Sequence, residues 1–290
     1  MSRIPPSGAV LVTGCSTGIG RASAIALHEA GRTVYASARR LESIADPAEL
    51  GIHTVALDVT DEASMVAAVQ TVQRESGGVA VLINNAGYGL YGPVEQVPMD
   101  EVRRQFETNF FGLVRLTQLV LPGMRRAKAG RILNVSSMGG RISLPGGAFY
   151  HASKYAVEGF SDALRMEVAQ FGIDVVLIEP GPVTTPWNDV AAGSMQGSAP
   201  ADGAAADGDP YRAFKQAVAG SFDAAASGPV GKLASTAEDI AKVITTAVTS
   251  NRPRTRYLIN AVAKALVATR ALLPARASDK VISLQYGLPR

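Results

Sequence analysis

Short apolar segments recur along the chain, and a longer amphipathic stretch follows most of them. Six of them span residues 9–13, 33–37, 53–57, 79–83, 131–135 and 174–178, and a seventh candidate spans 256–259. Apolar runs of four to eight residues that alternate with helices are typical of parallel strands buried on both faces. Since right-handed crossovers place helices on both faces of such a sheet, we expect an α/β fold: a doubly wound three-layer sandwich with about seven strands.

The helices between these strands are predicted from their periodicity and their breakers. We expect helices at 21–30, 62–75, 101–127, 150–170 and 236–250, with the third broken or kinked near Pro122. Residues 1–290 then form a single domain. Apolar residues 261–273, flanked by Arg270 and Arg276, predict a C-terminal helical extension over about 261–290.

Residues 191–210 have an unusual composition. Apart from Met195 and Gln196, they are all Ala, Gly, Ser, Pro or Asp. Such a stretch has little to bury, so we expect it to be mobile. It follows the sixth predicted strand and does not separate two equal halves. This favours a substrate lid over about 186–230, and a plain linker is the alternative.

Charge and cysteine content exclude several classes of protein. Lys and Arg exceed Asp and Glu by only three, which argues against a dedicated nucleic-acid binder. The single cysteine, Cys15, cannot form an intrachain disulfide or a zinc cluster, and the three histidines form no spaced ligand set, so we expect no metal. With no signal pattern and no long apolar run, we expect a cytoplasmic chain without a spanning segment. We expect the extension at 261–273 to pack on the core, which is the more common role of such a helix. Peripheral contact with a membrane or a subunit is the alternative.

A glycine-rich loop directly follows the first predicted strand. It reads Thr-Gly-Cys-Ser-Thr-Gly-Ile-Gly from Thr13 to Gly20, and a helix follows it. Glycines let backbone N–H groups approach a phosphate, and the helix N-terminus adds a favourable dipole. The spacing is not Gly-x-Gly-x-x-Gly, and the Gly-Lys-Ser/Thr ending of an NTPase loop is missing. An ordinary strand-to-helix turn is the alternative.

A tyrosine and a lysine lie one helical turn apart after the fifth predicted strand. Tyr150 and Lys154 share one face of the predicted helix 150–170. An ammonium group nearby favours the phenolate, which makes a tyrosine usable as a general acid/base near neutral pH. Ser137, thirteen residues earlier, ends the fifth strand, where its hydroxyl can steady a developing oxyanion. Together these residues indicate proton transfer at a carbonyl.

In these motifs, and in Asn109 on the third predicted helix, the chain resembles the classical short-chain dehydrogenases/reductases. The likeness covers residues 8–190, and the stretch 130–188 is similar to the hydroxysteroid and retinol dehydrogenase branch. It implies a Rossmann-type fold and hydride transfer between a nicotinamide cofactor and a carbonyl or alcohol. Tyr150 is then the general acid/base and Ser137 orients the carbonyl. Lys154 lowers the pKa of the tyrosine, and Asn109 holds a water that links the lysine to solvent.

The resemblance also implies which residues contact the cofactor. Asn85 is expected to support the sheet more than the chemistry, and Asp58 has helix capping as its alternative role. The expected cofactor contacts, besides Tyr150 and Lys154, are Gly14, Ser16, Thr17, Gly18, Ile19, Gly20, Asp58, Val59, Asn85, Ala86, Gly87, Pro180, Gly181, Val183 and Thr185.

The end of the second strand predicts which cofactor is used. NAD-selective sites carry an acid there for the ribose 2′-hydroxyl, but this strand ends without one. The resemblance places Ser37 where that acid would lie. Arg39 and Arg40 follow, and either can pair with a 2′-phosphate. We therefore predict NADP(H); two solvated arginines are the alternative.

The substrate is predicted only as a class. Gly139, Leu144 and Trp187 are candidate pocket walls and suit an apolar carbonyl or alcohol, steroid-like, retinoid-like or long-chain. A ketoacyl-thioester reductase and a non-catalytic NADP(H)-binding sensor or scaffold remain alternatives. The resemblance further implies a homodimer or homotetramer that pairs through the helices at 101–127 and 150–170.

Overall fold

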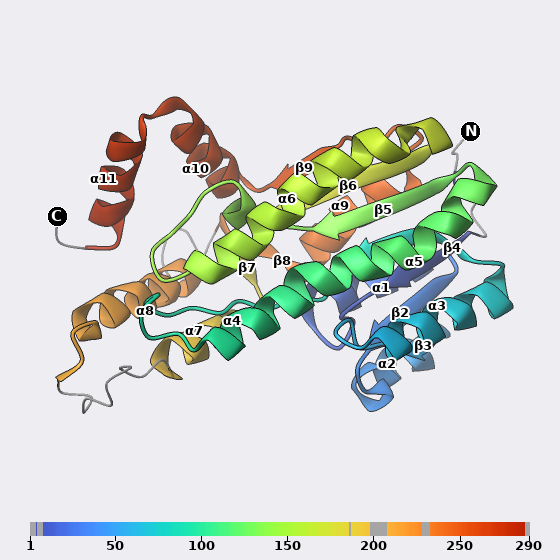
Figure 1. Cartoon of the computed structure of the whole chain (residues 1–290), viewed down its shortest axis with the longest axis horizontal. Coiled ribbons are helices and arrows are strands. Elements are labelled where there is room, and N and C mark those ends of the chain that lie inside the picture. Colours follow the sequence, from blue (N-terminus) through green and yellow to red (C-terminus); the bar gives the residue numbers. More distant parts are fainter. Residues whose placement is uncertain (1–3, 5–7, 186, 198–207, 228–232, 288–290) are drawn as a thin grey trace.

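A seven-stranded parallel sheet forms the centre of the molecule (Figure 1). The structure is a computed structural model that describes residue 4 and residues 8–185, 187–197, 208–227 and 233–287. The strand order is β3-β2-β1-β4-β5-β6-β9, and every neighbouring pair is parallel. The strands are β1 (Ala9–Val12), β2 (Val34–Ala38), β3 (His53–Ala56), β4 (Val79–Asn84), β5 (Gly130–Val135), β6 (Ile173–Pro180) and β9 (Arg256–Ile259). The seven predicted strands and the Rossmann-type α/β fold are confirmed.

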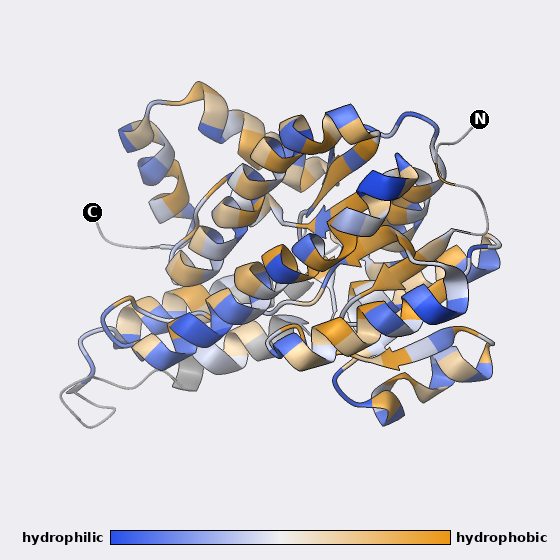
Figure 2. Ribbon diagram, turned by 45° about the vertical axis from the view of Figure 1, so that its right-hand side comes forward, coloured by the Kyte–Doolittle hydropathy of each residue, from blue (hydrophilic) through white to orange (hydrophobic). Residues whose placement is uncertain are grey.

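Helices cover both faces of the sheet, and the strand residues alternate between them. Val10 and Val12 pack with α1 (Gly18–Glu29) and α9 (Ala237–Thr249) on one face. Leu11 points to the opposite face, which α3 (Glu62–Ser76), α5 (Gly112–Ala127) and α6 (Ala148–Val168) cover. Figure 2 shows the apolar sheet enclosed between amphipathic helices. A strand buried on both faces is apolar at most positions, which explains the short apolar runs in the sequence.

Local capping defines several helix ends. The Asp61 carboxylate accepts hydrogen bonds from the amides of Ala63 and Ser64 at the start of α3, and Gly77 ends that helix with a φ of 75°. At α9, Thr236 and Asp239 form a reciprocal capping box. Side-chain caps of this kind satisfy backbone N–H groups that have no partner within the helix.

The third predicted helix is not broken near Pro122, and the alternative of a kink there stays a prediction. The helical stretch consists of α4 (Met99–Phe106), a π-helical turn (Glu107–Phe111) and α5, and α5 continues through Pro122 to Ala127. The irregular turn places Asn109 in the interior, where its side chain is 1% exposed. A single-turn π-helix inside an α-helix is often found at a functional site.

Helices also form where the sequence predicts a lid. α7 (Trp187–Gly197) and α8 (Arg212–Ser227) pack together and bury Ala191, Met195 and Val218. Residues 186, 198–207 and 228–230 of the predicted lid lie outside the described residues, and its mobility stays a prediction. A short parallel pair, β7 (Val183–Thr184) with β8 (Ser235–Thr236), lies before α7 and after α8 in sequence.

The chain continues beyond β9 with two further helices. α10 (Ala261–Leu272) and α11 (Ala275–Gln285) follow, and Figure 1 shows both beside the end of the molecule that carries α8. The remaining short helix, α2 (Ala45–Glu49), precedes β3. Among the described helices, none combines the length and apolar character needed to cross a membrane.

Candidate active site

A cleft of about 1020 Å³ lies at the carboxyl ends of the central strands. In parallel α/β sheets this edge, near the point where the strand order reverses, is where ligands bind. All but two of the sequence-predicted site residues line this cleft. The exceptions are Gly20, which packs against Gly14 of the glycine-rich loop, and Asn109, which is buried behind the residues that line the cleft. Within the described ranges, no group of three His, Cys, Asp or Glu side chains gathers in a way that could hold a metal ion.

The glycine-rich loop is held close to the end of β4. A Cβ added to Gly14 would lie 2.9 Å from the Ala86 Cα, and one added to Gly20 would lie 2.3 Å from the Gly14 carbonyl oxygen. Neither position tolerates a side chain without movement of the backbone. Gly14 also has a φ of 72°, in the left-handed region that favours glycine.

Asn85 ties the same loop to the sheet. Its side-chain amide donates to the carbonyl oxygens of Thr13, at 2.8 Å, and Gly14, at 3.2 Å. The backbone N–H groups of Asn85 and Ala86 both donate to the Thr13 hydroxyl. The structure therefore gives Asn85 the supporting role that the sequence predicts for it.

The start of α1 suits a phosphate group. Thr17 is the N-cap residue, and its side chain makes no capping hydrogen bond, in contrast to the caps of α3 and α9. The first N–H groups of α1 therefore remain available, and the helix dipole adds positive potential there. Thr17 and Gly18 both line the cleft. The residues present thus fit the pyrophosphate of a dinucleotide.

The end of β2 corrects one expectation. Ser37 does not face the cleft, because it is fully buried and its hydroxyl donates to the Val12 carbonyl oxygen at 2.9 Å. The next residue, Ala38, lines the cleft, and the exposed Arg39 and Arg40 follow it on the rim. The residue at the end of β2 that faces the cleft is therefore Ala38, so this position carries no acid either.

Asp58 does not cap the helix that follows it. Its carboxylate accepts hydrogen bonds from the backbone N–H and the hydroxyl of Thr60, at 2.9 and 2.7 Å. Asp61 is the N-cap of α3 instead. Both Asp58 and Val59 line the cleft beside β3. Asp58 thus fixes a turn in the cleft wall.

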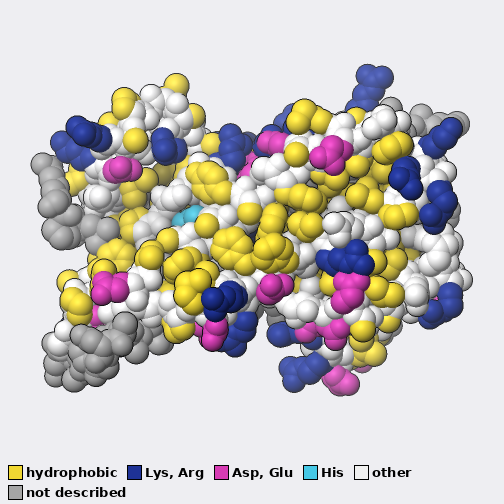
Figure 3. All heavy atoms as spheres, viewed as in Figure 1, with side chains coloured by type: hydrophobic (Ala, Val, Ile, Leu, Met, Phe, Trp, Pro, Cys, Tyr) yellow, Lys and Arg dark blue, Asp and Glu magenta, His cyan; other side chains and the backbone are white. Residues whose placement is uncertain are grey.

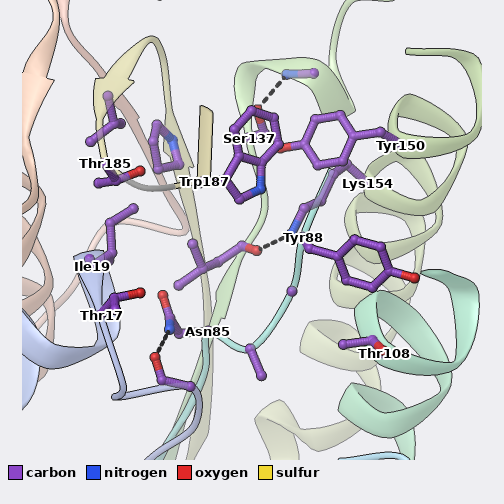
Figure 4. Close-up of a pocket in the computed structure, with 18 of the residues that line it drawn as sticks. Thr17, Ile19, Asn85, Tyr88, Thr108, Ser137, Tyr150, Lys154, Thr185 and Trp187 are labelled. Atoms are coloured by element: carbon purple, nitrogen blue, oxygen red, sulfur yellow. Dashed lines mark hydrogen bonds between the residues drawn. The ribbon is translucent and has the colours of Figure 1, made fainter. Parts of the chain in front are cut away.

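Tyr150, Lys154 and Ser137 converge at the centre of the cleft (Figure 4). Tyr150 and Lys154 are each only 6% exposed. The Lys154 ammonium donates to the Val135 carbonyl oxygen at 2.9 Å and lies 6.0 Å from the centre of the Tyr150 ring. The Tyr150 hydroxyl lies beside the Ser137 side chain, whose hydroxyl accepts from the Gly139 N–H at 3.0 Å.

Burial dominates the titration of these groups. It raises the pKa of Tyr150 to about 12, and the hydrogen bond to Ser137 acts in the opposite direction. It also lowers the pKa of Lys154 to about 8, against the attraction of Glu158. In the protein alone, the pKa of Tyr150 is therefore raised by burial and not lowered by Lys154 as the sequence predicts. At neutral pH Tyr150 holds its proton, as a general acid must.

Asn109 is fixed by the backbone of the loop after β4. Its side-chain oxygen accepts from the Tyr88 N–H at 3.0 Å, and its amide donates to the Tyr88 carbonyl oxygen at 2.9 Å. The amide also contacts the Ser153 hydroxyl at 3.1 Å. A Cβ added to Gly87 would lie 3.0 Å from the Asn109 oxygen and 3.7 Å from the Lys154 nitrogen. Asn109 and Lys154 therefore border the same small space, and the water link stays a prediction.

Comparison with known proteins decides the family. The family model described as short chain dehydrogenase matches residues 8–196. The chain belongs to this family. The short-chain dehydrogenase is 43% identical over 182 residues to 3-ketodihydrosphingosine reductase of Bacteroides thetaiotaomicron, a match that covers 62% of this chain and 65% of that protein.

Two further likenesses extend over most of this short-chain dehydrogenase. It is 32% identical to the NADPH-dependent 3-dehydrocapnine reductase of Ornithobacterium rhinotracheale, over 93% of this chain and 94% of that protein. A crystal structure of a short-chain dehydrogenase from Streptomyces avermitilis matches 97% of this chain and 96% of its own, with a TM-score of 0.77 and 31% identity. The family and its oxidoreductase class are therefore established for this chain.

Aromatic rings line one end of the cleft of the dehydrogenase. The Tyr150 ring centre lies 5.1 Å from that of Trp187 and 5.9 Å from that of Tyr91. Gly139, Leu144 and Trp187 line this end as predicted, and Val218 and Tyr286 join them from α8 and from the residue after α11. No sequence motif marks Tyr91, Val218 or Tyr286, because only the tertiary fold brings them to the cleft.

A buried ionic cluster lies next to Lys154 on α6. Glu158, one helical turn after Lys154, accepts from Arg256 at 3.2 Å, and Arg256 lies 3.0 Å from a carboxylate oxygen of Glu179. Glu179 is fully buried and Glu158 nearly so. Burial and the neighbouring Glu179 raise the pKa of Glu158, although Arg256 acts in the opposite direction.

This cluster predicts a pH dependence of folding stability. Because folding raises the pKa of Glu158 above its ordinary 4.5, the folded chain binds this proton more tightly than the unfolded chain. The stability from this group is present at low pH and falls as pH rises through the raised pKa. We expect Glu158→Gln to remove that fall, measured as the free energy of unfolding in urea at pH 5 and pH 8.

Glu62→Gln is the matched control for this measurement. Arg115 lowers the pKa of Glu62, which is exposed on α3, so this carboxylate stabilises the fold above its ordinary pKa. Both pH 5 and pH 8 lie above that ordinary pKa of 4.5, so Glu62→Gln should lower stability about equally at the two pH values and leave the pH difference of the wild type in place. An unchanged pH difference in Glu158→Gln would contradict the raised pKa of Glu158.

Proposed function

We propose that this short-chain dehydrogenase uses NADP(H) to interconvert an apolar carbonyl compound and its alcohol. One observation carries the proposal. The Tyr150 hydroxyl, beside Ser137 and one helical turn before Lys154, faces the aromatic end of the cleft. A non-catalytic binder of NADP(H) has no need for this proton-transfer set.

Two parts of the cleft support the assignment of the cofactor: the start of α1 and the end of β2. The uncapped start of α1 offers N–H groups to the pyrophosphate, and Arg39 and Arg40 border the cleft where β2 ends without an acid. The Ornithobacterium relative is named as an NADPH-dependent enzyme. The bound nicotinamide would supply hydride to the carbonyl carbon or accept it from the alcohol carbon.

The residues of the chain then handle the oxygen and its proton. The Ser137 hydroxyl would hydrogen-bond the carbonyl oxygen, and Tyr150 would donate its proton to that oxygen as negative charge develops. The Lys154 ammonium would stabilise the phenolate that remains and contact the nicotinamide ribose. Its low pKa of about 8 leaves Lys154 able to exchange protons near neutrality. Asn109 would position a water between Lys154 and solvent.

The substrate class rests on the walls of the cleft. Tyr91, Leu144, Trp187 and Val218 present apolar surface beside Tyr150, which favours a hydrophobic ketone or alcohol over a charged one. Both curated relatives described above are named as reductases. We propose a steroid-like, retinoid-like or long-chain substrate.

We also propose that the protein forms a homodimer or homotetramer through α5 and α6. Figure 3 shows hydrophobic side chains gathered over these two helices. Phe111, Tyr155 and Met166, in the turn before α5 and on α6, are 50%, 43% and 72% exposed. Exposed apolar patches of this kind mark protein interfaces. The molar mass from light scattering tests this, and a monomer would contradict it.

Consumption of NADPH, measured across a panel of ketones and aldehydes, tests the proposed function. The panel should include hydrophobic ketones of increasing length, a small polar ketone and a ketoacyl thioester. Turnover of the hydrophobic members with NADPH is the expected result. Preference for the polar ketone or the thioester would overturn the substrate class, and binding of NADPH with no turnover would overturn catalysis.

Cofactor selectivity gives a second prediction. Arg39→Asp removes one charge-assisted hydrogen bond to a 2′-phosphate and adds a repulsive charge, so the affinity for NADPH should fall about 100-fold. The affinity for NADH should stay the same or rise. Titration calorimetry with both cofactors measures the ratio. Arg126→Asp, at the far end of α5, is the control for a general charge effect, and equal losses in both variants would refute the assignment.

A further inference from the structure

The two C-terminal helices carry a concentration of positive charge. Residues 261–287 contain Lys264, Arg270, Arg276 and Lys280 but only one acid, Asp279. This short segment therefore has a net charge of +3, equal to that of the whole chain. Figure 3 shows dark-blue basic side chains together with yellow apolar ones at this corner of the molecule.

The four basic side chains are available to a partner. All four are exposed, and none forms an ion pair with another described residue. In contrast, Arg256 of the preceding strand is paired with Glu158, Glu179 and Asp162. The fold thus leaves the cations of α10 and α11 facing solvent.

Large apolar side chains are exposed on the same two helices. Leu272, at the end of α10, is 83% exposed, and Val281 and Leu284 on α11 are 47% and 62% exposed. Val281 and Leu284 are three residues apart and therefore share one face of α11. Exposed leucines beside unpaired cations form an amphipathic surface of the kind that lies at a lipid interface.

The inner side of α11 reaches the cleft. Ser278 is buried, and Tyr286, two turns later, lines the aromatic end of the cleft and is hydrogen-bonded to Ser221 of α8. Only helix α11 therefore separates the exposed side chains of Val281 and Leu284 from the part of the cleft where an apolar substrate would lie.

We propose that α10 and α11 form a docking surface for an anionic lipid bilayer, which delivers the apolar substrate to the cleft beside Tyr286. This inference rests on the proposed apolar substrate. Charge complementarity selects the partner, because basic residues near a membrane are attracted to anionic headgroups. A second copy of the same surface would bring two +3 segments together in a symmetric contact, which disfavours self-association there.

Sedimentation with vesicles tests the docking surface. The full-length protein should bind vesicles of equal phosphatidylglycerol and phosphatidylcholine, and bind pure phosphatidylcholine vesicles much more weakly. At about fivefold per cation, the variant Arg270→Gln/Arg276→Gln/Lys280→Gln should lose about 100-fold in partition coefficient. The control Arg103→Gln/Arg126→Gln/Lys242→Gln removes three exposed cations elsewhere and should bind like the wild type.

A separate variant tests the apolar contact between these helices and the bilayer. Leu272→Ser/Leu284→Ser should weaken vesicle binding and make the remaining binding more sensitive to salt, because only electrostatic attraction is left. Equal losses in the two charge variants, or equal binding to neutral and anionic vesicles, would overturn the proposal. A changed oligomeric state of the α10–α11 variants without lipid would assign the surface to subunit contact and also overturn it.

Turnover without lipid separates this proposal from the proposed function. Both charge variants should keep wild-type rates with a short, water-soluble ketone and NADPH in vesicle-free buffer. If the wild type binds anionic vesicles but shows no turnover with any ketone, the proposed function fails and the docking surface stands. If turnover is present and vesicle binding is absent, the docking surface fails and the proposed function stands.

Discussion

Replacement of Tyr150 by phenylalanine is expected to lower kcat for carbonyl reduction by about 10²- to 10⁴-fold, the usual contribution of a general acid. The variant keeps the ring that packs 5.1 Å from Trp187 and removes only the hydroxyl beside Ser137. The fold and the affinity for NADPH should therefore change little. Steady-state rates, together with the dissociation constant of NADPH from fluorescence titration, measure the two effects separately.

A second tyrosine on the same helix provides the matched control. Tyr155 is 43% exposed on α6 and does not line the cleft. Tyr155→Phe should leave kcat and the affinity for NADPH within about twofold of the wild type. If Tyr150→Phe retained more than a tenth of the wild-type kcat, another group would have to donate the proton and the assignment would fall.

Replacement of Arg131 by methionine should cost about 3 to 5 kcal/mol of folding stability, because it leaves buried polar groups without partners. Arg131 is fully buried in β5. Its guanidinium donates to the carbonyl oxygens of Ala247 and Val248, both at 2.7 Å, and pairs with Asp174 at 2.8 Å. The last carbonyl groups of α9 have no partner inside the helix. A cation beside them also interacts favourably with the negative end of the helix dipole.

Urea denaturation of three variants tests this role. Arg131→Met should show the full loss, and Arg131→Lys a smaller one, because a single ammonium keeps the charge but cannot reach all the acceptors. Arg126→Met, an exposed arginine on α5, should change the free energy of unfolding by less than about 0.5 kcal/mol. A loss below 1 kcal/mol in Arg131→Met would show that water replaces these contacts.

The parts of the fold that local patterns determine were predictable from the sequence. Strands buried on both faces are mostly apolar, so β1 and β4 appear as apolar runs, with Asn84 at the end of β4 as the exception. The glycine loop and the pair Tyr150 and Lys154 depend on short spacings within one loop and one helix. Their convergence in the cleft follows from the parallel sheet, which brings the carboxyl ends of the strands to one edge.

The parts that tertiary contacts determine were not predictable in this way. In a strand, a shift of one residue reverses the face. The resemblance placed the position of the NAD-selecting acid at Ser37, whose side chain is buried, whereas the neighbouring Ala38 lines the cleft. Helix α7 has a weak local signal, and its burial of Met195 depends on α8. The high pKa of Tyr150 reflects burial by residues far away in sequence.

Transfer of deuterium from NADPH that carries deuterium in both hydrogen positions at C4 of the nicotinamide tests the central claim most directly. The wild-type protein is incubated with the labelled cofactor and a hydrophobic ketone, and the product alcohol is analysed by mass spectrometry. We expect one deuterium on the carbinol carbon, and a higher rate with NADPH than with NADH. Bound NADPH with no labelled alcohol, or a higher rate with NADH, would contradict the account.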